Sequence, residues 1–191
     1  MIDPTVLLSA YASGYFPMGD SASGEIGWYS PDPRAVIPLD TFRIPRSLRQ
    51  ACRKELFEIR IDTAFGEVIR SCAAREETWI TPPIIDSYTE LFRLGYAHSV
   101  ETWKGGSLAG GLYGVALGGA FFGESMFSRE RDASKIALVA LVERMNRNGF
   151  ALLDTQFVTP HLARFGTVEI PRRAYLGRLR RAVRLDCSFL D

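Results

Sequence analysis

The sequence predicts an α+β fold built around a central antiparallel sheet. Three strand-like runs follow one another at residues 97–103, 107–116 and 119–127. The pairs Gly105-Gly106 and Gly118-Gly119 lie between them, and glycine pairs favour hairpin turns. The pattern then changes to helix, strand, helix and strand, starting with the apolar-periodic segment "ASKIALVALVERMNRN".

Several elements are expected before this meander. Residues 3–13 predict a short helix, and residues 14–40, which are rich in glycine, proline, serine and aromatics, predict a long irregular segment of the kind that is often functional. A helix entered near Pro45 and the strand "FEIRI" should follow. Asp62 is expected to cap a helix that runs to about Ala74, and Thr81-Pro82 to open a helix that runs to Gly95.

After the meander, Asp132 is expected to cap the longest helix and Gly149 to end it. The segment "ALLDTQF" reads as a strand, Thr159 and the proline after it open a short helix, and "TVEI" forms a last strand before a basic helical tail. We expect a small N-terminal domain over residues 1–60 and the main domain over residues 61–191.

Composition indicates a globular protein without extreme charge. The 191 residues are 47% apolar and 24% charged, with a net charge of +1, so a wholly basic nucleic-acid binder is disfavoured while a local basic patch stays open. The three cysteines have neither disulfide nor metal-ligand spacing, which favours reduced thiols and a cytoplasmic location. The first residues lack the features of a signal peptide, and no apolar run approaches the length of a membrane span.

Two polar residues interrupt the apolar strand at 151–157. Asp154 and Gln156 are two residues apart, so strand alternation should place them on one side and Thr155 on the other. A carboxylate and an amide together could orient an amine. The alternative is that Asp154 caps a loop and Gln156 faces solvent.

Glu124 lies in another unusual strand, "GGAFFGESMF". Alternation should put it on one face with Phe122 and Met126, where a buried carboxylate requires a cation or hydrogen-bond donors. A ligand ammonium would suit this site. The alternative is an intramolecular partner such as Lys135 or an arginine.

Two arginine-rich segments suggest phosphate contacts. Arg46, Arg49 and Arg53 share one face of a predicted helix, and the tail holds six arginines between residues 172 and 184. Trp28, Tyr29 and Trp79 fall in loops or at element ends, where aromatics can stack on bases. Solvated helix faces and packed lids are the alternatives.

No motif for a cofactor or metal is visible. His98 and His161 lack the spacing of a catalytic triad, and His98 alternates within a strand as a structural residue would. Glycine-rich phosphate loops, zinc spacings and dinucleotide fingerprints are absent from the sequence, so we expect neither a metal nor a cofactor.

An ordered set of motifs resembles one known family. "GYFPM", "WYSPDPRAVIPLD", "TWIT", "GGLYGVALGGAFFGESMFSRERDASKIAL", "LLDTQFVTPHLARFG" and "EIPRRAYL" follow the pattern of the leucyl/phenylalanyl-tRNA–protein transferases, over residues 8–176. The resemblance implies a small N-terminal domain beside a GNAT-like, acetyltransferase-like domain. It also implies transfer of Leu or Phe, and less well Met, from aminoacyl-tRNA to an N-terminal Arg or Lys of a protein, which creates an N-degron for proteolysis.

The resemblance also implies roles for particular residues. Asp154 and Gln156 match the catalytic pair, and Glu124 should lie near the reacting end of the ligand. The remaining matches are an apolar aminoacyl pocket of Leu112, Phe121, Met126 and Leu141, adenosine neighbours Trp79 and Tyr88, and a tRNA-binding cluster of Arg46, Arg49 and Arg53. This chain departs from the family pattern at Met18, where a tryptophan is familiar, and its N-terminal part is shorter than in many members.

Two other function classes compete with this one. An acyl-CoA-dependent acetyltransferase should carry a pyrophosphate loop after the meander, where "SRERDASK" stands instead. A non-catalytic RNA-binding module would explain the arginines and aromatics but not "GESMF" and "DTQ". We expect aminoacyl-tRNA and acceptor proteins as partners, no membrane partner, and a monomer.

Overall fold

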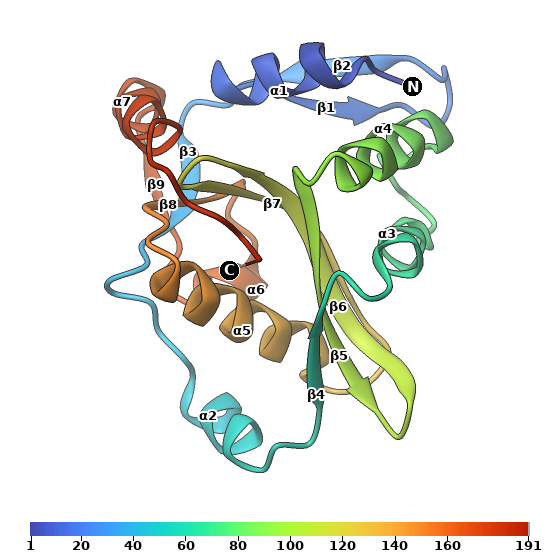
Figure 1. Cartoon of the computed structure of the whole chain (residues 1–191), viewed down its shortest axis with the longest axis vertical. Helices are drawn as coiled ribbons and strands as arrows, with labels where there is room; N and C mark the ends of the chain where they lie inside the picture. The colour runs from blue at the N-terminus through green and yellow to red at the C-terminus, as the bar shows by residue number, and fades with distance from the viewer. Residues whose placement is uncertain (191) are drawn as a thin grey trace.

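A seven-stranded sheet forms the centre of the computed structural model, which describes residues 1–190 (Figure 1). In spatial order the strands are β4 (Glu58–Ile61), β5 (Ala97–Lys104), β6 (Ser107–Leu117), β7 (Ala120–Ser128), β8 (Leu152–Gln156), β3 (Arg34–Ile37) and β9 (Val168–Ile170). All neighbours are antiparallel except β7 and β8, which are parallel. The predicted α+β class with a mainly antiparallel central sheet is confirmed.

Helices cover both faces of this sheet. One face packs against α1 (Pro4–Ala12), α3 (Phe65–Ala73), α4 (Pro82–Arg93) and α7 (Arg172–Ala182), and the other against α2 (Arg46–Arg53) and α5 (Ala133–Arg147). The short helix α6 (Pro160–Ala163) connects β8 to β9. Neighbouring residues of β7 alternate between the two cores, because Phe121 packs on the α5 side and Phe122 on the α1 side. No helix within residues 1–190 is long and apolar enough to cross a bilayer.

The segment 14–40 contains three strands, so the prediction that it is irregular was wrong. Besides β3, it forms a separate two-stranded antiparallel sheet of β1 (Phe16–Gly19) and β2 (Ile26–Tyr29). All four residues of β3 are buried, because the strand lies between β8 and β9 and under α7. Its sequence therefore lacks the alternation of apolar and polar residues by which a half-exposed strand is recognised. The predicted boundary near residue 60 stays a prediction, although β3 belongs to the same sheet as the later strands.

A β-bulge at Glu124 changes which face the residues of β7 point to. Tyr113 pairs with Ser125 and Gly114 pairs with Gly123, so Glu124 is an extra residue in the ladder. Phe122 therefore packs on the α1 side of the sheet, and Met126 packs on the α5 side. The expectation that Phe122, Glu124 and Met126 share a face was wrong for this reason.

Asp62 does not cap α3, whose N-cap is Ala64, and Asp132 takes the predicted N-cap position of α5 without a side-chain cap hydrogen bond. The carboxylate of Asp62 instead accepts from Nδ1 of His98 and the backbone N–H of Ser99, each at 2.7 Å, which supports a structural role for His98. Asp132 makes no cap hydrogen bond and pairs with Nζ of Lys135 at 2.5 Å. Both aspartates instead bond to partners outside the first turn of the helix backbone, which are His98 and Ser99 for Asp62 and the ammonium of Lys135 for Asp132.

Thr81 takes the N-cap position of α4, as predicted, but its hydroxyl makes no cap hydrogen bond and is buried without a partner among the described residues. Thr159 does cap α6, since its Oγ1 accepts from the N–H of Leu162 at 3.2 Å.

Pairing between β7 and β8 stops early, at Phe122 and Asp154. Beyond this point neither strand has the other as a ladder partner, although β7 continues to Ser128. The sheet is therefore open at the carboxyl ends of these two strands.

Candidate functional site

A cleft of about 1100 Å³ lies where β7 and β8 stop pairing. One part of its wall is apolar and consists of Leu112, Leu138, Leu141, Leu153 and Met126. Other lining residues are polar and come from β7, β8, α5 and α6, including Glu124, Gln156, Lys135 and His161. Phe16, Met18 and Trp79 contribute a third wall from β1 and from the loop before α4. The cleft can therefore hold an apolar group and a polar reacting group side by side.

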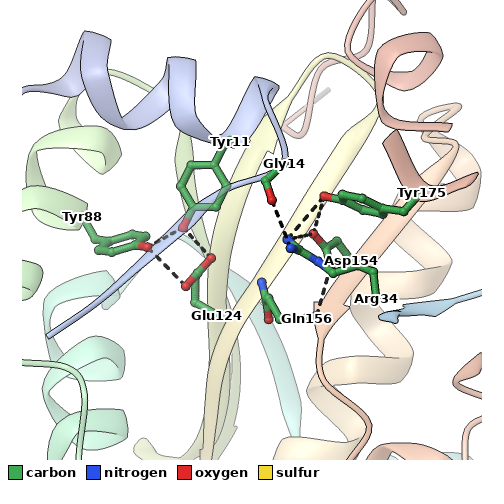
Figure 2. A network of polar contacts seen from close by, with 8 residues as sticks. All are labelled: Tyr11, Gly14, Arg34, Tyr88, Glu124, Asp154, Gln156 and Tyr175. Atoms are coloured by element: carbon green, nitrogen blue, oxygen red, sulfur yellow. Dashed lines mark hydrogen bonds and ion pairs between the residues drawn. The ribbon is translucent and has the colours of Figure 1, made fainter. Parts of the chain in front are cut away.

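Asp154 is completely buried, and its carboxylate accepts hydrogen bonds from several donors (Figure 2). Arg34 binds it with two parallel hydrogen bonds, from Nε to Oδ1 at 2.9 Å and from Nη2 to Oδ2 at 2.7 Å. The hydroxyl of Tyr175 donates to Oδ2 at 2.7 Å. A carboxylate that already accepts this many hydrogen bonds is held rigidly.

Gln156 ends β8 in a left-handed backbone conformation, with a φ of 60°. Its backbone N–H donates to Oδ1 of Asp154 at 2.9 Å, so the carboxylate that Arg34 holds also fixes the backbone of Gln156. A non-glycine residue at positive φ costs free energy and persists where surrounding contacts require it.

The side chain of Gln156 is 6% exposed, which rules out the solvent-facing alternative. Its Nε2 is buried and has no hydrogen-bond partner within residues 1–190, although the residue lines the cleft. Asp154 does act on the loop backbone, as that alternative supposed, but it does not contact the side-chain amide of Gln156.

Glu124 faces the same region from β7, and its partners are hydroxyl groups rather than a cation (Figure 2). Tyr11 donates to Oε1 at 2.6 Å and Tyr88 to Oε2 at 3.2 Å, while the two hydroxyls bond to each other. Burial raises the pKa of Glu124 to about 7, although both tyrosine hydroxyls lower it in part. A carboxyl group with such a pKa can exchange a proton near neutral pH.

Comparisons with known proteins cover nearly the whole chain. A family model described as leucyl/phenylalanyl-tRNA protein transferase matches residues 36–180, and the model of its N-terminal domain matches residues 1–32. A leucyl/phenylalanyl-tRNA–protein transferase of Gloeobacter violaceus is 55% identical over 98% of this chain and 97% of its own length. Relatives of the same name from Salinibacter ruber and Herpetosiphon aurantiacus are 56% and 53% identical over 98% of this chain, and over 82% and 98% of their own lengths.

The chain belongs to the leucyl/phenylalanyl-tRNA–protein transferase family. It is therefore an aminoacyltransferase, as the sequence motifs had predicted. The family models meet between residues 32 and 36, just before β3.

The cleft of this transferase contains most, but not all, of the residues predicted for the ligand. Leu112, Met126, Leu141 and Trp79 line it. Phe121 does not, because it is buried in the core and stacks on Phe189 with ring centroids 5.2 Å apart. Tyr88 is also fully buried, and its hydroxyl reaches the cleft only through Glu124. Sequence position alone could not separate lining residues from the layer behind them.

The predicted arginine cluster of the transferase lies outside the cleft. Arg46, Arg49 and Arg53 are exposed on α2, which packs through Leu48 against the α5 side of the core. Arg49 donates to the carbonyl of Ile44 at 3.3 Å, and the other two have no hydrogen bond or ion pair within the described chain. Exposed guanidinium groups of this kind are available for phosphate contacts.

Sequence reasoning missed several residues of this site. Arg34, Tyr11 and Tyr175 hold the two carboxylates, and Leu138 and Leu153 complete the apolar wall. The arginine at the start of the apolar run "RAVIPL" was the one available signal, since a buried arginine requires an acidic partner.

His161 also lines the transferase cleft, from α6. Its Nε2 is buried without a partner in the described chain, and burial together with the charges of Lys135 and Arg164 lowers the pKa of its imidazole.

Proposed function

We propose that this enzyme transfers Leu or Phe, and less well Met, from aminoacyl-tRNA to the N-terminal Arg or Lys of acceptor proteins. The product is a new peptide bond, and the added residue serves as an N-degron for proteolysis in the cytoplasm. The enzyme needs no metal or cofactor for this, because an aminoacyl ester is already activated. It acts as a monomer with a GNAT-like catalytic domain, residues 61–191, beside a small N-terminal domain, residues 1–60.

The observation that carries this proposal is the position of Gln156. This buried amide lines the cleft next to an apolar wall formed by Leu112, Met126 and Leu141, with Leu138 and Leu153. An unbranched Cβ followed by a wide apolar group, as in Leu and Phe, suits such a wall. Val and Ile are branched at Cβ and differ from Leu and Phe in shape there. Apolar pockets discriminate between such side chains by about 10- to 200-fold in kcat/KM per methylene.

The ester end of the substrate then lies at the polar part of the cleft. The acceptor amine attacks the ester carbonyl, the new C–N bond forms, and the ester C–O bond breaks, so that the ribose oxygen of the tRNA leaves with a proton. Gln156 accepts a hydrogen bond from the attacking amine through its side-chain oxygen and holds it about 3 Å from the carbonyl carbon. Its contribution is orientation, because an amide is too weak a base to keep the proton.

Glu124 is better suited than Asp154 to take up the proton that the attacking amine loses. Asp154 is saturated by Arg34, Tyr175 and the backbone of Gln156, and it does not line the cleft. Glu124 lines it and has a pKa near that of an α-amino group, which is ordinarily about 8. Asp154 therefore acts as a positioning residue for the backbone of Gln156.

Recognition of the tRNA uses surfaces outside this centre. Trp79 contacts the terminal adenosine at the third wall of the cleft, while Tyr88 acts from behind Glu124. Arg46, Arg49 and Arg53 bind phosphates of the tRNA, as their exposure allows.

The test is transfer from radiolabelled Phe-tRNA to a peptide that begins with Arg, with acetyl-CoA as donor in a parallel reaction. The proposal expects a product lengthened by Phe, identified by mass, and no acetylated product. Acetylation without Phe transfer would replace it with the acetyltransferase function. Binding of tRNA with neither reaction would indicate a non-catalytic RNA-binding protein.

A further inference from the structure

The outer surface of α7 carries arginines that nothing in the fold uses. Arg173, Arg180 and Arg181 of α7 and Arg184, two residues past its end, are exposed, and none of their side chains makes a hydrogen bond or ion pair within residues 1–190. At 3.6 residues per turn the three arginines of the helix fall within roughly 100° of its circumference and extend along about 12 Å of it, and Arg184 follows in the turn after the helix. We call these four residues the arginine strip.

The opposite side of α7 is packed against the protein. Tyr175, Leu179 and Ala182 are buried, and the hydroxyl of Tyr175 contacts Asp154 at 2.7 Å. The helix is therefore held rigidly, and it has no free apolar face with which to enter a lipid surface. A rigid row of unpaired guanidinium groups matches a polyanion with regularly spaced phosphates better than it matches a membrane.

A chain of contacts leads from the cleft to this strip. Phe16 lines the cleft, and its cross-strand partner Tyr29 lies on the same face of the β1–β2 sheet, with ring centroids 6.2 Å apart. Tyr29 is 47% exposed and so presents an open ring. The next residues of the chain, Ser30–Asp32, hold the start of α7.

Two hydrogen bonds fasten that junction. The backbone N–H of Arg172 donates to Oδ1 of Asp32, and Nη1 of Arg172 donates to the carbonyl of Ser30, each at 3.0 Å. The order in space is thus cleft wall, exposed ring, first turn of α7 and arginine strip. An exposed aromatic followed by free arginines is the arrangement that binds a single strand by stacking and then its backbone by charge.

We propose that Tyr29 and the arginine strip form an RNA track, on which Tyr29 stacks against an unpaired base near the 3′ end of the tRNA and the strip binds phosphates beyond it. This inference rests on the proposed function, because the direction of the track assumes that the aminoacylated end occupies the cleft. Figure 1 shows α7 and α2 at opposite ends of the long axis, so the strip is separate from the arginines of α2.

The test measures binding of a tRNA that carries phenylalanine through a non-hydrolysable amide, over 50–200 mM salt. Arg173→Gln/Arg180→Gln should raise Kd and reduce the log–log salt slope by about 1.4–1.8, the value for two lost phosphate contacts. The matched control is Arg70→Gln/Arg147→Gln, which removes two exposed arginines, also unpaired in the described chain, from α3 and α5. The control should keep the wild-type slope.

Tyr29 has its own matched control in Trp28, which is 40% exposed on the same strand but points to the other face. Tyr29→Ala should weaken binding of a short single-stranded RNA ending in adenosine by about 5- to 150-fold, the range for one stacked base. Trp28→Ala should leave that affinity unchanged.

Several results would contradict the track. These are equal salt slopes for the strip variant and its control, equal effects of Tyr29→Ala and Trp28→Ala, or a strip variant that loses binding to anionic vesicles and keeps tRNA binding. Transfer activity separates this failure from that of the proposed function. A wild-type chain that transfers nothing contradicts the proposed function, whereas normal transfer with unchanged tRNA binding in the strip variant contradicts the track alone.

Discussion

A buried ion pair of Arg34 and Asp154 lies behind the candidate site, with Nη2 of the arginine 2.7 Å from Oδ2 of the carboxylate. The two residues are 120 positions apart in the sequence, and both are buried. Asp154 and Gln156 could be singled out from sequence because polar residues interrupt an apolar strand. Arg34, Tyr11 and Tyr175 could not, because only the folded chain brings them to the carboxylates.

Replacing one member of this pair should destabilise the fold strongly. Arg34→Met leaves the carboxylate of Asp154 buried without its cation, and we expect a loss of about 3–5 kcal/mol in the free energy of unfolding. The double variant Arg34→Met/Asp154→Leu should be more stable than Arg34→Met alone, since it leaves no unpaired charge. Urea unfolding of the two variants measures this, and a double variant that loses the sum of the single effects would contradict it.

Glu124 should make stability depend on pH. The folded chain holds a proton on this carboxyl up to about pH 7, whereas the unfolded chain releases it near its ordinary pKa of 4.5. Stability from this group is therefore present below pH 4.5 and is lost as the pH rises through 7, with an upper limit of about 3 kcal/mol. Between pH 5 and pH 8, the free energy of unfolding measured in urea should fall less for Glu124→Gln than for wild type. The same pH dependence in both proteins would count against a raised pKa of Glu124.

At the scale of elements, long periodic segments were predictable and local exceptions were not. The strands β5, β6 and β7 and the helix α5 were expected within a residue or two, because each has many residues that repeat one pattern. Short strands such as β3 lack such a repeat. The bulge at Glu124 follows from how β6 and β7 align, which no residue of β7 reveals by itself.

The helix α2 should contribute to tRNA affinity but not to the chemistry. Neutralising Arg46, Arg49 and Arg53 should weaken binding of charged tRNA and flatten its salt dependence by about 0.7–0.9 in log–log slope per lost contact. A small aminoacyl-adenosine analogue lacks the stem phosphates and should bind almost as to wild type. Equal losses for tRNA and analogue would mean misfolding or a direct role in the pocket.

The strand β7 supplies both a residue that we expect to read the substrate and a control for it. Met126 lines the cleft, and its flexible side chain can fit a ring or a branched aliphatic group, so the stiffer Met126→Val should change kcat/KM for Phe-tRNA and Leu-tRNA by different factors. We expect a difference of about 1 kcal/mol or more between the two substrates. Competition between them for one Arg-peptide, read by product mass, measures it.

Phe121→Leu is the matched control, because Phe121 lies in the core behind the cleft and stacks on Phe189. It should lower stability and leave the Leu/Phe product ratio unchanged. An unchanged Leu/Phe product ratio in Met126→Val would show that other residues shape the pocket. A changed ratio in Phe121→Leu would show that Phe121 helps to shape it after all.

At the scale of the molecule, the cleft is a product of the whole chain. Phe16, Trp79, Met126, Gln156 and His161 come from five separate elements or loops, and they meet because β7 and β8 stop pairing after Phe122 and Asp154. The sequence motifs identified the enzyme family and most of the cleft residues. They could not predict which of these residues face the ligand, because that depends on the bulge in β7 and the left-handed backbone at Gln156.

Single-turnover transfer from Phe-tRNA to an Arg-peptide by Gln156→Ala tests the central claim most directly. Its cleft-facing amide has no partner within residues 1–190, so truncation should leave the fold and tRNA affinity close to wild type. We expect the rate of peptide-bond formation to fall by about 10²-fold or more, the scale of a lost positioning group in proton transfer. A rate near that of wild type, with substrate saturating, would contradict the assignment of Gln156 to the reacting centre.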